Sequence, residues 1–205
     1  MKAFTQIEQQ KLSPAEALKR LQEGNTRFLQ HQPVERNLLG QVEATQGGQY
    51  PFACVLGCID SRVPAEIVFD QGIGDIFNVR IAGNFVNTDI LGSMEFACQV
   101  AGSKLIVVLG HTSCGAIKGA CDHVELGNLT AMLKNFDSVL ESVSYEGDRS
   151  SKNKEFVDLV TQKNVIDTIA NIKSQSPVLN ALYEDGSIDI VGAVYDVASG
   201  KVHFL

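Results

Sequence analysis

Phe52-Ala53-Cys54-Val55-Leu56-Gly57 is a short, continuously apolar run that leads directly into Cys58-Ile59-Asp60-Ser61-Arg62. Such a run is typical of a strand that is buried on both faces of a sheet. Apolar runs of the same kind predict further strands at 76–81, 104–109 and 188–195, and a last strand is expected at 201–205, after the turn Ser199-Gly200.

Helical patterns lie between these expected strands. Ser13-Pro14-Ala15-Glu16 is a capping box with proline at the first helical position, so a helix is expected from there through about Phe28. Further helices are predicted at 64–69, 89–101, 129–143 and 155–174. Strands that alternate with helices indicate an α/β fold with a mostly parallel sheet, and the tight turn before the last strand predicts an antiparallel edge. We expect one domain over residues 1–205, with an N-terminal helical arm over about 1–45.

The composition of the chain indicates which kinds of binding partner and which cellular location to expect. The chain has 205 residues and a formal net charge of -7, which disfavours nucleic acid as a partner. No apolar stretch reaches the roughly 20 residues of a membrane span, and the first ten residues lack the apolar region of a signal peptide. A cytoplasmic protein is expected. Five cysteines, an odd number spread widely, favour reduced thiols with a metal over a disulfide framework.

Three residues form a candidate zinc site. Cys58 follows the first expected strand, and His111-Thr112-Ser113-Cys114-Gly115 follows the third. Two thiolates and one imidazole are a zinc ligand set, and three protein ligands leave the fourth tetrahedral position open. In open α/β sheets, ligands bind beyond the carboxyl ends of the strands, which is where both motifs are expected.

Neighbouring residues extend this site. In an extended segment Cys58, Asp60 and Arg62 share a face, so Arg62 is expected to hold the Asp60 carboxylate ionised. Gly110 and Gly115 are expected to mark a tight turn where the backbone can approach a ligand, which makes Gly115 a candidate substrate contact.

Taken together, these motifs resemble the β-class carbonic anhydrases. The resemblance includes Cys-x-Asp-Ser-Arg, then Arg80-Ile81-Ala82-Gly83-Asn84, then His-x-x-Cys-Gly and the C-terminal Ile-Val-Gly-Ala-Val-Tyr-Asp, and it covers about residues 13–205. It implies a five-stranded sheet with Zn2+ on Cys58, His111 and Cys114. It also implies an obligate homodimer with sites at the subunit interface, and such dimers often pair again into a dimer of dimers.

Single positions refine the resemblance. Gln49 matches the glutamine that lines the substrate pocket in the plant-like subgroup, and Phe77 matches a pocket phenylalanine that comes from the neighbouring subunit. Phe96 stands where many members have tyrosine. Val55 stands where the bicarbonate-inhibited subgroup has tryptophan, so the zinc site is expected to be open at neutral pH. Arg80 matches the arginine of that regulatory site.

The resemblance implies zinc-dependent, reversible hydration of CO2 to bicarbonate and a proton. Zinc lowers the pKa of its water towards about 7, and Asp60 would orient the resulting hydroxide towards CO2. Asp60 is also a conditional fourth ligand when its pair with Arg62 is broken or the pH falls. Two alternatives stay open: a hydrolase of carbonyl sulfide or carbon disulfide on the same fold, and a non-catalytic, zinc-stabilised binding module. The helix at 13–28 has no obvious core of its own to complete, so we expect it to pack across the partner.

Overall fold

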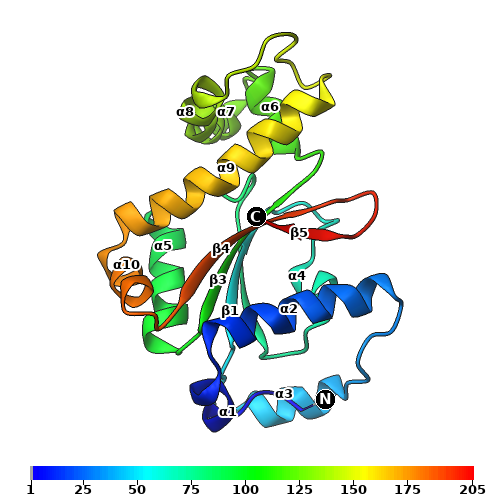
Figure 1. The fold of residues 1–205 in the computed structure, drawn as a ribbon, viewed down its shortest axis with the longest axis vertical. Coiled ribbons are helices and arrows are strands. Elements are labelled where there is room, and N and C mark those ends of the chain that lie inside the picture. The colour runs from blue at the N-terminus through cyan, green and yellow to red at the C-terminus, as the bar shows by residue number, and fades with distance from the viewer. Residues whose placement is uncertain (1) are drawn as a thin grey trace.

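The computed structural model describes residues 2–205, and within them a five-stranded sheet has the strand order β2-β1-β3-β4-β5 (Figure 1). Neighbouring strands from β2 to β4 are parallel, whereas β5 runs antiparallel to β4. The predicted mostly parallel sheet with an antiparallel edge strand is therefore confirmed. The strands are β1 Ala53–Gly57, β2 Ile76–Arg80, β3 Leu105–His111, β4 Asp189–Tyr195 and β5 Val202–Phe204.

Helices surround the sheet. They are α1 Gln6–Lys11, α2 Pro14–Leu29, α3 Leu38–Thr45, α4 Ala65–Val68, α5 Thr88–Glu95 continued by the π-helix η1 Phe96–Val100, α6 Gly115–Cys121, α7 Gly127–Leu133, the 3-10 helix η2 Lys134–Phe136, α8 Asp137–Ser142, α9 Lys154–Gln175 and α10 Pro177–Glu184. Among residues 2–205, none of the helices combines the length and the apolar character that a membrane crossing needs.

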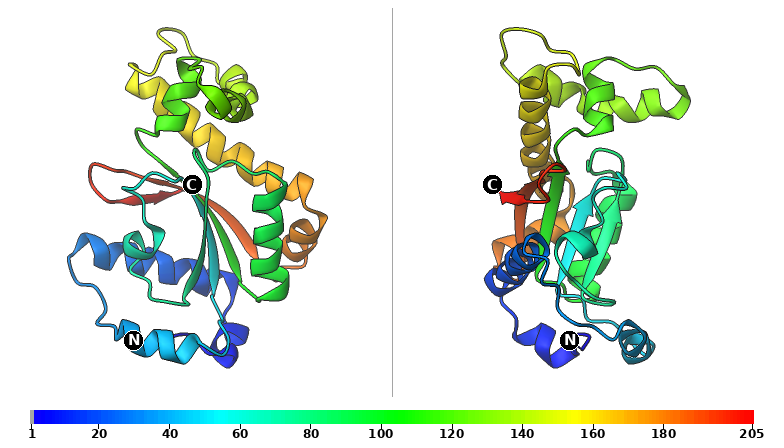
Figure 2. Two further views of the ribbon diagram at one scale, coloured as in Figure 1. Left: turned by 180° about the vertical axis from the view of Figure 1, so that it is seen from behind. Right: turned by 90° about the vertical axis from the view of Figure 1, so that its right-hand side faces the viewer.

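The central strands β1 and β3 are buried along their whole length. Because side chains alternate between the two faces of a strand, Val55 and Val107 pack with α2 and α4 on one face. Leu56 and Val108 pack with α5, α9 and α10 on the other face. The right-hand view of Figure 2 shows α2 and α5 on opposite sides of the sheet. Burial on both faces explains why these strands read as continuous apolar runs.

Helix α2 begins where the sequence predicts. The Ser13 hydroxyl accepts a hydrogen bond from the Glu16 N–H (3.3 Å), and the Glu16 carboxylate accepts one from the Ser13 N–H (2.8 Å). The expectation that this helix has no core of its own to complete is wrong. Ala17 and Leu21 are fully buried against the sheet of the same chain, so α2 completes one face of the core.

Other helices differ from the expectations. Helix 129–143 is interrupted by η2, and helix 89–101 ends in the π-helix η1. Helices α1, α3 and α10 were not predicted, although α10 begins with the common pair Ser176-Pro177, in which the serine caps the helix and proline takes the first helical position. Pro64 is the N-cap of α4 and not its first residue.

A small helical cluster stands beyond the carboxyl ends of the parallel strands. Helices α6, α7 and α8 gather with the first half of α9 at one end of the molecule (Figure 1). Their apolar core includes Phe136 and Ile117, and it also includes Cys58 and Cys114. The candidate zinc site therefore lies between the end of the sheet and this helical cluster.

Candidate metal centre

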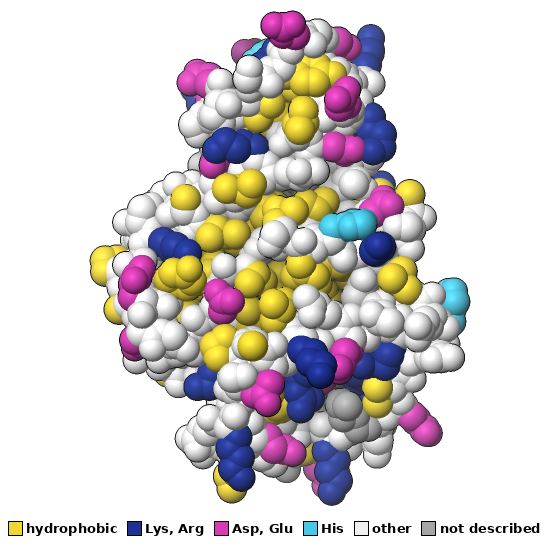
Figure 3. All heavy atoms as spheres, in the orientation of Figure 1, with side chains coloured by type: hydrophobic (Ala, Val, Ile, Leu, Met, Phe, Trp, Pro, Cys, Tyr) yellow, Lys and Arg dark blue, Asp and Glu magenta, His cyan; other side chains and the backbone are white. Residues whose placement is uncertain are grey.

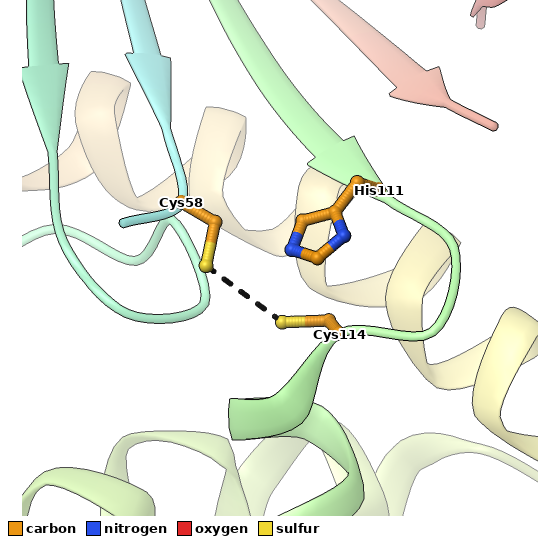
Figure 4. Close-up of side chains that lie close together, drawn as sticks. All are labelled: Cys58, His111 and Cys114. Carbon is orange, nitrogen blue, oxygen red and sulfur yellow. Dashed lines mark hydrogen bonds between the residues drawn. The ribbon is translucent and has the colours of Figure 1, made fainter. Parts of the chain in front are cut away.

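The three predicted ligands meet at the carboxyl ends of two neighbouring parallel strands (Figure 4). Cys58 directly follows β1, His111 is the last residue of β3, and Cys114 is the N-cap of α6. The two sulfurs lie 4.0 Å apart. They and a ring nitrogen of His111 all lie within 4.8 Å of one another. A tetrahedral zinc with Zn–S bonds of about 2.3 Å holds two sulfurs about 3.8 Å apart, so this spacing fits the metal.

The imidazole of His111 presents a lone pair to the two sulfurs. Its Nδ1 lies 3.0 Å from the carbonyl oxygen of Thr112, which can only accept, so Nδ1 carries the proton. The ring is fully buried, and its Nε2 has no hydrogen-bond partner among residues 2–205. Buried polar atoms are normally satisfied, and a metal ion would satisfy this one. The donors and their orientation therefore fit zinc.

The thiols of Cys58 and Cys114 form a coupled pair. Their mutual hydrogen bond lowers the pKa of Cys58, which the backbone N–H of Gly83, 3.3 Å from the Cys58 sulfur, lowers further. The same contact, together with burial, raises the pKa of Cys114. Without a metal, the pair therefore holds one proton and one negative charge. A divalent cation would displace the remaining proton, because thiolates are the species that bind zinc.

Asp60 and Arg62 form the predicted ion pair. Oδ1 of Asp60 accepts hydrogen bonds from the backbone N–H and the Nε of Arg62, both at 2.9 Å, and Oδ2 accepts one from Nη2 at 2.7 Å. These bonds from Arg62 lower the pKa of Asp60 from 3.8 to about 2. Oδ2 also lies 3.9 Å from Nε2 of His111, so the carboxylate stands at the edge of the metal centre.

The carbonic anhydrase family matches residues 53–202, a stretch that includes all three metal ligands and the Asp60–Arg62 pair. The chain belongs to the carbonic anhydrase family. It is 38% identical to "Carbonic anhydrase 2" of Mycobacterium tuberculosis over 193 aligned residues. The alignment covers 92% of this chain and 91% of that protein.

Solved β-carbonic anhydrases share the fold of this carbonic anhydrase. A tetrameric enzyme from Sordaria macrospora superposes with a TM-score of 0.68 at 27% identity, covering 80% of this chain and 85% of that one. CafA of Aspergillus fumigatus superposes with a TM-score of 0.71 at 25% identity, covering 93% and 89%. The resemblance to the β class is therefore confirmed, whereas the plant-like subgroup stays a prediction.

Two local expectations about this carbonic anhydrase need correction. Cys58, Asp60 and Arg62 do not share an extended segment, because the chain turns: the N–H of Val63 bonds the carbonyl oxygen of Asp60 at 3.0 Å. The turn brings Arg62 back onto the carboxylate, so the predicted pair forms for a different reason.

The turn before α6 also differs from the expectation. Gly110 lies within β3, where an added Cβ would come within 2.7 Å of Cγ2 of Val165, so glycine allows α9 to pack closely. The turn itself is at Thr112 and Ser113, and Ser113 has a left-handed φ of 57°. Gly115 is the exposed first residue of α6, and an added Cβ there would meet nothing within 4 Å. The space beside Gly115 is open.

The sequence did not show what Arg80 contacts. Its Nε donates to the carbonyl oxygen of Cys58 at 2.7 Å, and its Nη2 donates to the carbonyl oxygen of Asp60 at 2.6 Å. One guanidinium thus fixes the backbone on both sides of Ile59. The strand position of Arg80 was a usable signal, since Arg80 pairs with Gly57, directly before the ligand.

Of the expected pocket residues, Gly115 directly follows the ligand Cys114, whereas Gln49 and Phe77 lie on other parts of the chain. Gln49 is exposed and precedes β1, whereas Cys58 follows it, and a five-residue strand is about 17 Å long. Phe77 is half-buried on β2, and its ring meets that of Phe96 edge-on at 6.2 Å. Phe96 is 50% exposed.

The remaining cysteines, Cys54, Cys98 and Cys121, are buried and free. Burial raises the pKa of Cys54, raises that of Cys98 to about 12, and raises that of Cys121 to about 11. All three stay neutral at physiological pH and pack as small apolar side chains.

Proposed function

We propose that this carbonic anhydrase hydrates carbon dioxide reversibly to bicarbonate and a proton in front of Cys58, His111 and Cys114. One observation carries the proposal: a buried imidazole nitrogen that finds no hydrogen-bond partner in residues 2–205 faces two sulfurs 4.0 Å apart, beside an ionised carboxylate. Three protein ligands leave one position for water or substrate. Zinc bound there would supply the Lewis acidity that makes water nucleophilic at neutral pH.

We assign Asp60 to orient the attacking water. With a pKa of about 2 it is ionised at neutral pH, so it accepts hydrogen bonds and cannot donate them. Oδ1 already accepts two bonds from Arg62, whereas Oδ2 accepts one and keeps a lone pair on the side of His111. A water O–H that donates to Oδ2 directs its own lone pair away from the carboxylate, towards CO2. Arg62 is a positioning residue, because it acts through Asp60.

We also propose that the fourth position is open at neutral pH and that Asp60 takes it only conditionally. The bonds from Arg62 that hold the carboxylate support this, as does the fully buried Val55 in place of tryptophan. Activity should then fall smoothly with pH between about pH 9 and pH 6.5, with no steep loss tied to bicarbonate. A strongly cooperative profile with noncompetitive bicarbonate inhibition would contradict this.

We propose a homodimer or a dimer of dimers in which Gln49 and Phe77 complete the neighbouring subunit's substrate pocket and Gly115 contacts the substrate. The position of Gln49 at the opposite end of β1 from Cys58 supports this, as does the exposed Phe96 beside Phe77. Hydrophobic side chains also gather across the middle of the face in Figure 3, which lies on the opposite side of the sheet from α5 and would suit a second contact between dimers. The Sordaria macrospora enzyme that shares this fold is tetrameric. We further propose a cytoplasmic location, which the five free cysteines support.

Stopped-flow measurement of CO2 hydration at about pH 8 tests the reaction. The zinc-loaded protein should hydrate CO2 rapidly, with much slower hydrolysis of carbonyl sulfide and carbon disulfide offered separately. Preferential hydrolysis of either sulfur compound would favour the hydrolase alternative. Stoichiometric zinc without any of the three activities would favour a zinc-stabilised binding module.

A further inference from the structure

A buried asparagine outside the metal ligands contacts the loop that bonds the Cys58 sulfur. The N–H of Gly83 donates to Sγ of Cys58 at 3.3 Å. On the other side of the same α-carbon, the carbonyl oxygen of Gly83 accepts a hydrogen bond of 2.9 Å from Nδ2 of Asn164. Asn164 lies on α9, and only 3% of its surface is exposed. Helix α9 and the first metal ligand are thus joined through one glycine.

This glycine needs an external partner to keep its orientation. Gly83 has a φ of 77° and the next residue, Asn84, has a φ of 46°, so the chain passes through two left-handed residues in succession. Glycine is obligatory here, because a Cβ would come within 2.3 Å of the Phe136 ring. Glycine also moves more freely in φ and ψ than any other residue. Within the loop, the Asn84 N–H donates to the Ile81 carbonyl oxygen at 3.0 Å. This bond does not involve the Gly83 carbonyl oxygen, which is left to accept from Asn164.

We propose that Asn164 is a positioning residue for the metal centre: it holds Gly83 so that the Gly83 N–H stays on the Cys58 sulfur and keeps that sulfur in the orientation in which it faces His111 and Cys114. This inference rests on the proposed zinc site. A hydrogen bond from a fixed N–H limits where the sulfur can lie, and it delocalises the charge of a sulfur that binds a metal, so it supports Cys58 as a ligand. Partners that orient and tune metal ligands in this way typically change metal affinity about 10–100-fold.

The chemistry of α9 distinguishes Asn164 from its neighbours. Thr161, almost one turn earlier, is also buried, but its hydroxyl donates back to the Val157 carbonyl of its own helix at 2.8 Å. Thr168, about one turn later, is buried to a similar degree. The amide of Asn164 instead reaches out of the helix to a loop 81 residues earlier in the chain. A neutral donor of this length supports the carbonyl without adding charge beside the thiolates.

The test compares Asn164→Leu, which keeps the side-chain size but removes the donor, with Thr168→Val as a buried control on the same helix. Zinc affinity is measured by competition with a chelator, and the thiolate-to-metal charge-transfer band is recorded for the cobalt(II)-substituted proteins. We expect zinc to bind Asn164→Leu about 10–100-fold more weakly with a shifted band, and Thr168→Val to match the wild type. Unchanged affinity and spectrum in Asn164→Leu would overturn the proposal, as would equal changes in the control.

A second measurement needs no variant and covers the case in which Asn164→Leu does not fold. In wild-type protein loaded with an NMR-active isotope of cadmium, the Gly83 amide proton should exchange slowly and couple to the metal across the N–H···S bond. A fast-exchanging, uncoupled Gly83 amide would overturn the proposal. None of these readouts uses CO2. Loss of hydration with an intact Asn164 effect would contradict the proposed function alone, and the reverse result would contradict this inference alone.

Discussion

At the scale of single residues, Asp60 meets Arg62 through a turn of the backbone, and this contact sets the state of the carboxylate beside the metal ligands. The bonds from Arg62 lower the pKa of Asp60 from 3.8 to about 2. A group with a lowered folded-state pKa contributes stability above its unfolded pKa and loses it as the pH falls through the folded value. The Asp60 carboxylate is therefore already ionised at pH values well below 7. Its protonation does not limit activity near neutral pH.

Asp60→Asn and Arg62→Ala should each reduce CO2 hydration about 10²-fold or more while keeping zinc, because both remove an oriented acceptor from the reacting water. In Arg62→Ala the pKa of Asp60 should rise towards 3.8, still below neutral, so the loss reflects orientation and not charge. Asp185→Asn is the control, since Asp185 also accepts from the N–H two residues on (2.8 Å) but lies away from the metal ligands. Near-wild-type rates in either site variant would remove the pair from the mechanism.

The sequence was sufficient to predict that Cys58, His111 and Cys114 come together, because both motifs follow apolar runs that form neighbouring strands. It was not sufficient to predict the contacts of Arg80 or Asn164. Both side chains donate to backbone carbonyl oxygens, which every residue carries, so only the folded chain shows which carbonyl is reached. The turn at Asp60 was missed for a related reason, since it depends on a backbone bond to Val63.

At the scale of elements, the strands were predictable and some helices were not. Burial on both faces leaves a clear apolar run in β1 and β3, whatever surrounds them. In residues 129–143 the apolar residues recur with a helical period, which predicts one helix. In the structure the Asn135 side chain donates to the Met132 carbonyl at 2.7 Å, and the chain forms a 3-10 turn that buries Phe136. Local bonds from asparagine compete with helix formation, and their outcome depends on packing.

Asp70→Asn should destabilise the N-terminal segment. The Asp70 carboxylate is 5% exposed and binds Arg27 of α2 and Arg36 before α3. Burial opposes ionisation, but the hydrogen bonds from these arginines outweigh it and hold the pKa of Asp70 below 3.8. Removing the charge leaves Arg36 buried and unpaired, which typically costs about 3–5 kcal/mol. Urea unfolding near neutral pH measures this loss.

The pH dependence of the free energy of unfolding tests the same ion pairs. Because the folded-state pKa of Asp70 is lowered, its contribution is present above about pH 4 and disappears as the pH falls through the folded value. Wild type should therefore lose more stability than Asp70→Asn on acidification. Asp167→Asn, which breaks an i,i+4 pair with Lys163, should cost only about 0–1 kcal/mol. Equal losses in the two variants would show that Asp70 does not hold the segment.

At the scale of the whole molecule, the candidate metal centre lies between the sheet and the helical cluster α6–α8, and Gly115 lies beside it, whereas Gln49 precedes β1 and Phe77 lies on β2. A single chain thus brings the three candidate ligands together, but it does not show how Gln49 and Phe77 would line the substrate pocket. The sequence could not show this separation, because distance across the sheet becomes known only with the strand order. The proposed assembly of subunits would bring the two sets of residues together.

Light scattering should show no monomer at micromolar concentration, because obligate interfaces tend to bury more than about 2,000 Å² of apolar surface. Phe96→Glu should weaken assembly and activity together, since Phe96 is 50% exposed on the chain and borders Phe77. Leu126→Glu, at a residue that is 68% exposed beside the helical cluster, should leave both unchanged. An active, monodisperse monomer would contradict the interface-site proposal.

The central claim is that CO2 hydration depends on one zinc per chain held by Cys58, His111 and Cys114. Its most direct test adds zinc stepwise to metal-free protein and measures bound zinc and the stopped-flow hydration rate on the same samples. The account predicts a rate that rises linearly to one zinc per chain and then stays constant. Cys121→Ser should behave as wild type, whereas Cys58→Ser and Cys114→Ser should gain neither stoichiometric zinc nor rate. Stoichiometric zinc in both ligand variants, or hydration by the metal-free protein, would contradict it.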